Sequence, residues 1–340
     1  MTIVLQIVIT IMTATPHWNF KDLILKEIKQ NGGFVNAHAH IDRAFTITPD
    51  SLDIYRKHTL EEKWDLVDAV KDASEEVYYK RISQGLELMI SQGVTAVGSF
   101  IDIDPIAEDR AAKAAVRAKN QYKSQIAVVL INQVLKGVIE PGARKWFDRA
   151  MEYVDIVGGL PKRDERDYGK GAEHIDILLS SAKKYGKMAH IHVDQFNTQK
   201  DKETELLADK TIEHGMQGRV VAVHSISLAS HPQEYREKVY AKLKKAEVMV
   251  IGCPTAWIDA PRHEELQPFH NALTPVDELV KHGITVAIGS DNIADYMLPF
   301  TDGDMWNELK LMAIGNRFMN LDELVKIATV NGRKVLGLSS

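Results

Sequence analysis

Eight short apolar segments, rich in β-branched residues, recur along this 340-residue chain, and longer amphipathic segments separate them. The apolar segments predict strands at residues 34–39, 95–100, 126–131, 154–158, 188–193, 219–224, 247–252 and 284–289. Apolar residues three and four positions apart predict helices at residues 75–92, 107–119, 172–185, 203–215, 232–246 and 275–282. Strands and helices therefore alternate along the chain.

Strands that are apolar throughout indicate a parallel sheet covered by helices on both faces. Eight such strand–helix units predict an α/β chain closed as a (β/α)8 TIM barrel. An open doubly wound sheet is the alternative, but no Gly-x-Gly-x-x-Gly and no phosphate-binding loop follows a strand. Because no Pro/Gly/Ser-rich linker divides the chain, we expect an N-terminal segment at 1–33, with a remnant strand and a helix, and one barrel domain at 34–340.

The charge balance and the cysteine content restrict the partners and the location. Forty-two Lys and Arg residues against 47 Asp and Glu give a net charge of −5. We therefore expect a small-molecule substrate and no nucleic-acid or membrane partner. The single Cys253 excludes zinc sites built on paired cysteines and favours a cytoplasmic protein with a buried, inert thiol. Residues 2–12 are apolar but too short to span a bilayer, so we interpret them as a buried strand, with a secretion signal or a misassigned start as the alternative.

Histidine and aspartate residues gather at the ends of four predicted strands, where the active site of a barrel forms. They are His38 and His40 on the first strand, His190 and His192 on the fifth, His224 on the sixth and Asp291 after the eighth. Because side chains alternate along a strand, residues two apart face the same side. Any one of these histidines could be a hydrogen-bonded structural residue, but packing does not explain their convergence on one rim.

Three neutral imidazoles and one carboxylate around an open position suit a divalent ion such as zinc or ferrous iron. Such an ion lowers the pKa of a bound water to near neutrality and yields a hydroxide nucleophile. The sequence therefore predicts a hydrolytic metal site.

These residues resemble the metal-dependent amidohydrolase superfamily, and within it the cytosine deaminase-like group. Further landmarks of that group match residues 154–161, 185–194, 215–224 and 328–336, so the resemblance covers about 34–338. It implies that the metal ligands are His38, His40, His192 and Asp291, that Asp291 also accepts a proton from the attacking water, and that His224 contacts the nucleophile or the substrate. It further implies a single metal ion, zinc preferred and iron the alternative, because strand four ends in glycines and offers no bridging lysine.

Two departures from the deaminase pattern affect the predicted chemistry. Gln195 replaces a glutamate that transfers a proton to the substrate ring in the deaminases, and Asn292 replaces an acid after the metal aspartate. Glutamine cannot exchange a proton, but it can hold a carbonyl or a ring nitrogen by hydrogen bonds. Near the end of the third strand, Leu135 stands where that group has a glutamine, with Gln133 two residues away. The resemblance thus implies a rebuilt substrate pocket.

Arg43, Trp257 and His190 complete the candidate site, each with two readings. Arg43 could pair with a substrate carboxylate or form a structural ion pair with an acid such as Asp42. Trp257 could stack on a flat ring or cover the barrel mouth. His190 could be a ligand, but we favour a buried histidine that supports the ligands by a hydrogen bond.

The leading hypothesis is a metal-dependent hydrolase that cleaves a non-peptide C–N bond of a small nitrogen compound, preferably a heterocycle, as a deaminase or an amidase. The alternatives are a lactone or ester hydrolase on the same metal site, and a catalytically silent barrel that only binds. Relatives usually carry a small β-rich domain, which we expect to be reduced or absent because about 33 residues precede the first strand. An apolar face left open in this way would favour a homo-oligomer.

Overall fold

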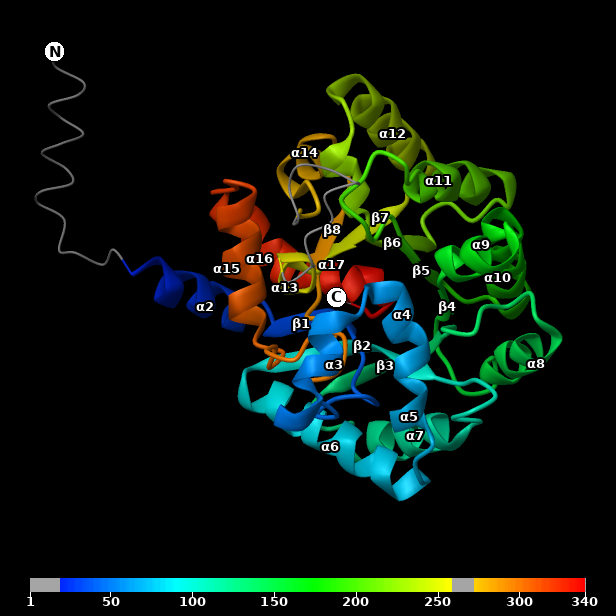
Figure 1. The fold of residues 1–340 in the computed structure, drawn as a ribbon. Coiled ribbons are helices and arrows are strands. Elements are labelled where there is room, and N and C mark those ends of the chain that lie inside the picture. The colour runs from blue at the N-terminus through cyan, green and yellow to red at the C-terminus, as the bar shows by residue number, and fades with distance from the viewer. Residues whose placement is uncertain (1–18, 259–271, 340) are drawn as a thin grey trace, which may run out of the picture.

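The computed structural model describes residues 19–258 and 272–339 and shows eight strands surrounded by helices (Figure 1). The strands are β1 (Phe34–Ala39), β2 (Val94–Asp102), β3 (Ala127–Gln133), β4 (Val157–Gly159), β5 (Ala189–Val193), β6 (Val220–His224), β7 (Met249–Gly252) and β8 (Val286–Ile288). Each lies on or beside a predicted strand. The predicted strand at residues 2–12 lies outside the described residues.

The strands form a closed, parallel barrel. Strands β1 to β3 and strands β4 to β8 pair in sequence order. Two isolated parallel bridges join these groups, Ile131 with Ile156 and Ala39 with Asp291. At the second junction the Asp291 amide donates to the His38 carbonyl at 2.9 Å. The predicted (β/α)8 barrel is therefore confirmed, and its closure brings the ends of β1 and β8 together.

Helices form the outer layer and most of the connections. They are α2 (Phe20–Gln30), α3 (Leu52–Lys57), α4 (Leu60–Leu66), α5 (Asp68–Lys71), α6 (Glu75–Ser91), α7 (Arg110–Tyr122), α8 (Pro141–Ala150), α9 (Pro161–Tyr168), α10 (Gly171–Tyr185), α11 (Glu203–Glu213), α12 (Gln233–Ala246), α13 (Pro254–Ile258), α14 (Val276–Lys281), α15 (Met305–Gly315), α16 (Leu321–Ala328) and α17 (Val330–Val335), with 3₁₀ turns at Pro49–Ser51 and Ile226–Ser230. The six predicted helices are all present. Helices α3 to α5, which sequence periodicity did not predict, form an insertion between β1 and α6.

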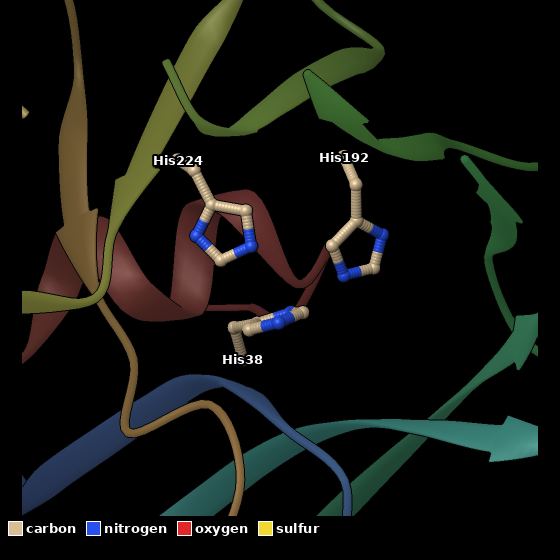
Figure 2. A group of neighbouring side chains, drawn as sticks. All are labelled: His38, His192 and His224. Atoms are coloured by element: carbon tan, nitrogen blue, oxygen red, sulfur yellow. The ribbon is translucent and has the colours of Figure 1, made fainter. Parts of the chain in front are cut away.

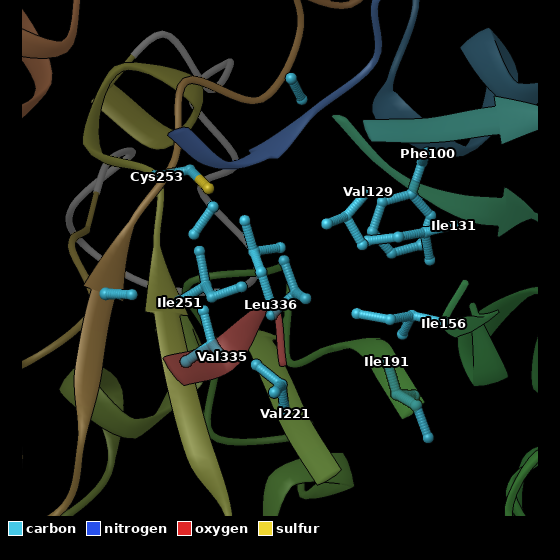
Figure 3. Packing of buried hydrophobic residues seen from close by; sticks show 14 of the residues in the cluster. Phe100, Val129, Ile131, Ile156, Ile191, Val221, Ile251, Cys253, Val335 and Leu336 are labelled. Atoms are coloured by element: carbon cyan, nitrogen blue, oxygen red, sulfur yellow. The ribbon is translucent and has the colours of Figure 1, made fainter. Parts of the chain in front are cut away.

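Side chains from the strands fill the barrel interior, and α17 closes one end of it. Phe100 and Ile131 pack in a buried cluster that also contains Val335 and Leu336 (Figure 3). A Cβ atom on Gly98 of β2 would lie 2.3 Å from a methyl group of Leu336 and 2.8 Å from the backbone carbonyl oxygen of Ala37 in β1, and the backbone contact requires glycine here. Helix α17 lies near the start of the strands, because Gly332 approaches Val35 of β1 and Gly337 approaches Met188 just before β5. The C-terminal ends of the strands are left for a site.

The first described helix, α2, packs against α16 and leaves Phe20 and Leu23 exposed. No helix among residues 19–258 and 272–339 is long and apolar enough to cross a membrane.

Candidate metal centre

Four histidines and one aspartate converge at the C-terminal ends of the strands. One ring nitrogen each of His38, His192 and His224 lies within 4.8 Å of the others, and their rings point toward a common centre (Figure 2). The Oδ1 atom of Asp291 lies 3.3 Å from Nε2 of His38 and 3.2 Å from Nε2 of His40. All five side chains are buried. The structure thus brings together the histidines of β1, β5 and β6 and the aspartate after β8, as the sequence predicted.

The backbone around these residues is shaped for the cluster. Gly289, just after β8, lies so close to β1 that a Cβ atom on it would be 2.6 Å from the Cβ of His38. Asp291 has φ of 62° and His224 has φ of 81°, both in the left-handed region that side chains seldom adopt. Strained backbone of this kind is typical of functional sites, where the surrounding structure maintains it.

Hydrogen bonds determine which nitrogen of His192 is free. Its Nδ1 atom lies 3.0 Å from the carbonyl oxygen of Gly159, which can only accept, so Nδ1 carries the proton. The Nε2 atom then holds an unshared electron pair toward the cluster. A ligand histidine whose other nitrogen donates to a backbone carbonyl is the usual arrangement in metal sites.

His224 has the opposite tautomer. The indole N–H of Trp257 donates to Nδ1 of His224 at 3.0 Å, and an indole nitrogen can only donate. The proton of a neutral His224 ring is therefore on Nε2, which lies 3.9 Å from Oδ2 of Asp291. His224 thus offers a hydrogen-bond donor to the cluster, whereas His192 offers a lone pair.

The protonation states suit a cation. Burial lowers the pKa of His40 and of His224 to about 3, and it lowers the pKa of His192 well below its usual value. Burial would raise the pKa of Asp291, but contacts with the rings of His38 and His40 outweigh it and hold the pKa well below the ordinary range. The cluster therefore combines the neutral imidazoles of His40, His192 and His224 with an ionised carboxylate.

The donor set fits a divalent metal ion. Within the described chain, both ring nitrogens of His38 and Nδ1 of His40 are buried without a hydrogen-bond partner. Buried polar atoms without a partner are costly, so these nitrogens fit a cluster that binds a cation. Imidazole nitrogens and a carboxylate oxygen are ligands that zinc and ferrous iron accept.

A cavity of about 350 Å³ opens beside the cluster, and its walls include every substrate-contact residue predicted from the sequence. Gln195 lines it, with a buried Nε2 atom that has no hydrogen-bond partner among the described residues. Asn292 also lines it and donates to Oδ2 of Asp295 at 2.5 Å. Trp257 lies at the same wall, and its ring is 5.1 Å from that of His224. Gln133 lines the cavity too, so both candidates at the end of β3 face it.

Arg43 shows features of both readings. Its Nη1 atom lies 3.7 Å from Oδ2 of Asp102, so a structural ion pair with an acid is present, and the acid is Asp102. Burial and the charge of Asp102 raise the pKa of Asp42 to about 7. Arg43 nevertheless lines the cavity, and within the described structure Nε and Nη1 have no hydrogen-bond partner.

His190 is separate from the cluster. Its Nε2 atom lies 2.8 Å from the carbonyl oxygen of Val335, so the ring is tied to the end of α17. The favoured reading, a buried hydrogen-bonded histidine, agrees with this contact. The expected hydrogen bond to the metal ligands was wrong, because the hydrogen bond of His190 goes to the backbone of α17.

Sequence reasoning did not find part of the cavity wall. Leu60 and Trp64 of α4 and Phe196 of the β5–α11 loop line the cavity. The surrounding residues of α4 are mostly charged, and such a short helix gives no periodicity that distinguishes a wall from a solvated loop. Only the folded chain places this insertion over the barrel mouth.

The fold and the site define the class of protein. The family model described as "Amidohydrolase family" matches residues 32–340, so the chain belongs to the amidohydrolase family. It is a metal-dependent hydrolase of carbon–nitrogen bonds other than peptide bonds.

Individual relatives cover most of the chain. A Haemophilus influenzae protein of unknown function is 60% identical over 263 residues, which are 77% of this chain and 95% of that protein. The N-isopropylammelide isopropyl amidohydrolase of Pseudomonas sp. is 26% identical over 319 residues, 90% of this chain and 74% of that protein. The crystal structure of 5-methylcytosine deaminase from Klebsiella pneumoniae, liganded with phosphonocytosine, is 25% identical, has a TM-score of 0.81 and covers 90% of this chain and 75% of that chain.

Proposed function

We propose that this chain uses one divalent ion, zinc in preference to iron, to hydrolyse a C–N bond of a small nitrogen heterocycle. His38, His40, His192 and Asp291 would hold the ion. The observation that carries this proposal is the pair of opposite tautomers, because Nε2 of His192 is free to bind a cation while Nε2 of His224 carries a proton. When bound, the ion supplies Lewis acidity and makes water a nucleophile at neutral pH.

The chain's own residues then have separate roles. Asp291 is ionised and reaches the centre, so it accepts a proton from the attacking water and returns it to the leaving nitrogen. The Nε2–H of His224 donates a hydrogen bond to the oxygen that becomes negative during attack. Gln195 holds the substrate through its side-chain Nε2, which has no hydrogen-bond partner among the described residues.

Three further residues shape the substrate position. Asn292 is oriented by Asp295, so its side-chain oxygen is available as an acceptor. Because the indole N–H of Trp257 is used by His224, the proposed contact with the substrate is through the ring face. Arg43 would bind an electron-rich group of the substrate, since two of its nitrogens lack hydrogen bonds within the described structure.

A heterocyclic substrate is favoured by two relatives, one named for N-isopropylammelide and the other for 5-methylcytosine. A lactone or ester hydrolase would use the same cluster, and a silent barrel would keep the fold without turnover. The relatives favour C–N hydrolysis over both. We further propose a cytoplasmic protein that self-associates through exposed apolar residues such as Phe20 and Leu23 of α2.

The test is to measure metal content and the release of ammonia or amine on the same sample, across aminopyrimidines, aminotriazines, their N-alkyl derivatives and simple amides. About one ion per chain with release that depends on it supports the proposal. Asp291→Asn should abolish release, and substantial residual activity would remove Asp291 from the proton-transfer role. Metal without release from any C–N compound, together with turnover of lactones or esters, would overturn it.

The chemistry at position 195 can be tested separately. Gln195→Glu introduces a group that can donate a proton to a ring nitrogen, and it should create or raise ammonia release from aminopyrimidines. An unchanged profile across the panel would show that this side chain does not face the reacting ring.

A further inference from the structure

Apolar side chains line the cavity where it borders the C-terminal ends of the neighbouring strands β3, β4 and β5. They are Leu60 and Trp64 of α4, Leu135 after β3, Leu160 after β4 and Phe196 after β5, and we call them the apolar wall. Trp257, after β7, and Met297, after β8, line the cavity from the other half of the barrel. The apolar wall is thus built from one sector of the barrel and the insertion above it.

The apolar wall begins directly beside the predicted metal ligands. The carbonyl oxygen of Gly159 holds the ring of His192, and the next residue is Leu160. Leu135 lies two residues after Gln133, the last residue of the neighbouring strand β3. A group bound at His192 therefore has apolar surface within reach along the same edge of the barrel.

The part of the wall that comes from α4 is held in place. Trp64 is only 2% exposed, and the guanidinium of Arg166 lies 5.3 Å from the centre of its ring. The next residue, Asp65, lies 3.0 Å from Lys136 and 3.0 Å from Arg163. These contacts tie α4 to the loop after β3 and to α9, so the wall exists before a ligand binds.

The cavity is also larger than a single small ring requires. Its volume of about 350 Å³ lies within the range of roughly 300–1,000 Å³ that is typical of sites for drug-sized ligands. A bare pyrimidine or triazine held at the predicted metal ligands would leave the apolar wall facing water. Burying apolar surface there is favourable, and a substituted ligand can do so.

We propose that the apolar wall is a subsite for an alkyl or aryl substituent of the substrate, so that the substrates are substituted nitrogen compounds rather than bare rings. This inference rests on the proposed function, because it assumes that the reacting group of the substrate binds at the proposed metal ion. It adds a specificity determinant that is distinct from the groups carrying out hydrolysis.

A series of straight-chain hydroxamates tests the subsite without knowledge of the substrate. The hydroxamate group chelates divalent metal ions, and the tail lengthens from acetohydroxamate through butyro- and hexano- to octanohydroxamate. Affinities are measured by titration calorimetry on zinc-loaded protein. Each buried methylene should tighten binding by about fourfold until the cavity is full. Metal-free protein is the control for binding that does not involve the cluster.

Matched variants locate the tail. Leu135→Ser should reduce the gain per methylene to less than about twofold while acetohydroxamate binds as before, whereas Met297→Ser, after β8, should keep the full gain. Phe196→Ser is a second wall variant, at a more exposed position, in case Leu135→Ser does not fold. A loss of the gain in the Met297 variant alone would overturn the assignment of the subsite.

The outcomes separate the two proposals. Acetohydroxamate binding with no dependence on tail length would overturn the subsite and leave the metal site standing. No binding of acetohydroxamate to protein that has been loaded with zinc would overturn the metal site and the subsite that depends on it.

Discussion

Replacing Trp257 with phenylalanine removes a single hydrogen bond from the candidate site. In the native chain the indole N–H lies 3.0 Å from Nδ1 of His224 and so fixes the proton on Nε2. Phenylalanine keeps an aromatic ring near the imidazole but has no donor. Either nitrogen of His224 can then carry the proton, and the donor toward Asp291 is present only part of the time.

The size of the effect follows from these contacts. Leaving a buried ring nitrogen without its partner costs about 1–3 kcal/mol. Removing one donor from the oxygen that develops negative charge costs on the order of 10² to 10³ in kcat when the donor is lost completely. In Trp257→Phe the Nε2 atom of His224 still carries the proton part of the time, so we expect kcat to fall about tenfold to hundredfold. Metal content should stay at the native level, since His224 is not among the proposed ligands.

Three measurements check this prediction. Metal content and steady-state kcat are compared for native protein, Trp257→Phe and Trp306→Phe, the last a tryptophan on α15 outside the cavity wall. Nitrogen NMR of the histidine rings reports which nitrogen of His224 carries the proton. Loss of metal in Trp257→Phe would refute the assignment of His224 as a donor, and an unchanged kcat would refute its role in the reaction.

Three more outcomes depend on other parts of the chain. His192→Ala should reduce metal content well below one ion per chain, whereas His190→Ala should retain the ion, because His190 bonds to a backbone carbonyl. Metal analysis after dialysis that shows the reverse would make His190 the ligand and His192 the structural residue. Lys71→Met should lower the free energy of unfolding by about 3–5 kcal/mol. The reason is that Nζ of Lys71 lies 2.6 Å from Oδ2 of the buried Asp104, and its loss leaves that carboxylate without its ion-pair partner. A urea titration measures this change, and a value below about 1 kcal/mol would contradict the reasoning. Burial raises the pKa of Glu308 from 4.5 to about 8. Between these pH values the folded chain keeps a proton that the unfolded chain releases, so the free energy of unfolding falls as the pH rises from about 4.5 through 8. Glu308→Gln should therefore lose less stability than the native chain between pH 5 and 8, and equal slopes in urea titrations at several pH values would argue against a buried, protonated Glu308.

The fold could be predicted because its signals are local. Apolar segments of strand length alternate with amphipathic helices, and each pattern depends on neighbouring residues only. The first-strand histidines could be paired by the same logic, since residues two apart face one side of a strand. Convergence with His192 and Asp291 followed once the strands were assigned to a parallel barrel, whose C-terminal ends share one rim.

The sequence by itself therefore determined the barrel, the histidines and the aspartate at its rim, and the two neutral positions Gln195 and Asn292. Only the tertiary structure decided the tautomers of His192 and His224, because each depends on a partner from another segment, the carbonyl of Gly159 or the indole of Trp257. It also decided that His190 forms a hydrogen bond with the backbone of α17 and that α4 contributes to the apolar wall of the cavity. Contacts of this kind join residues far apart in the chain, and no local pattern of polarity encodes them.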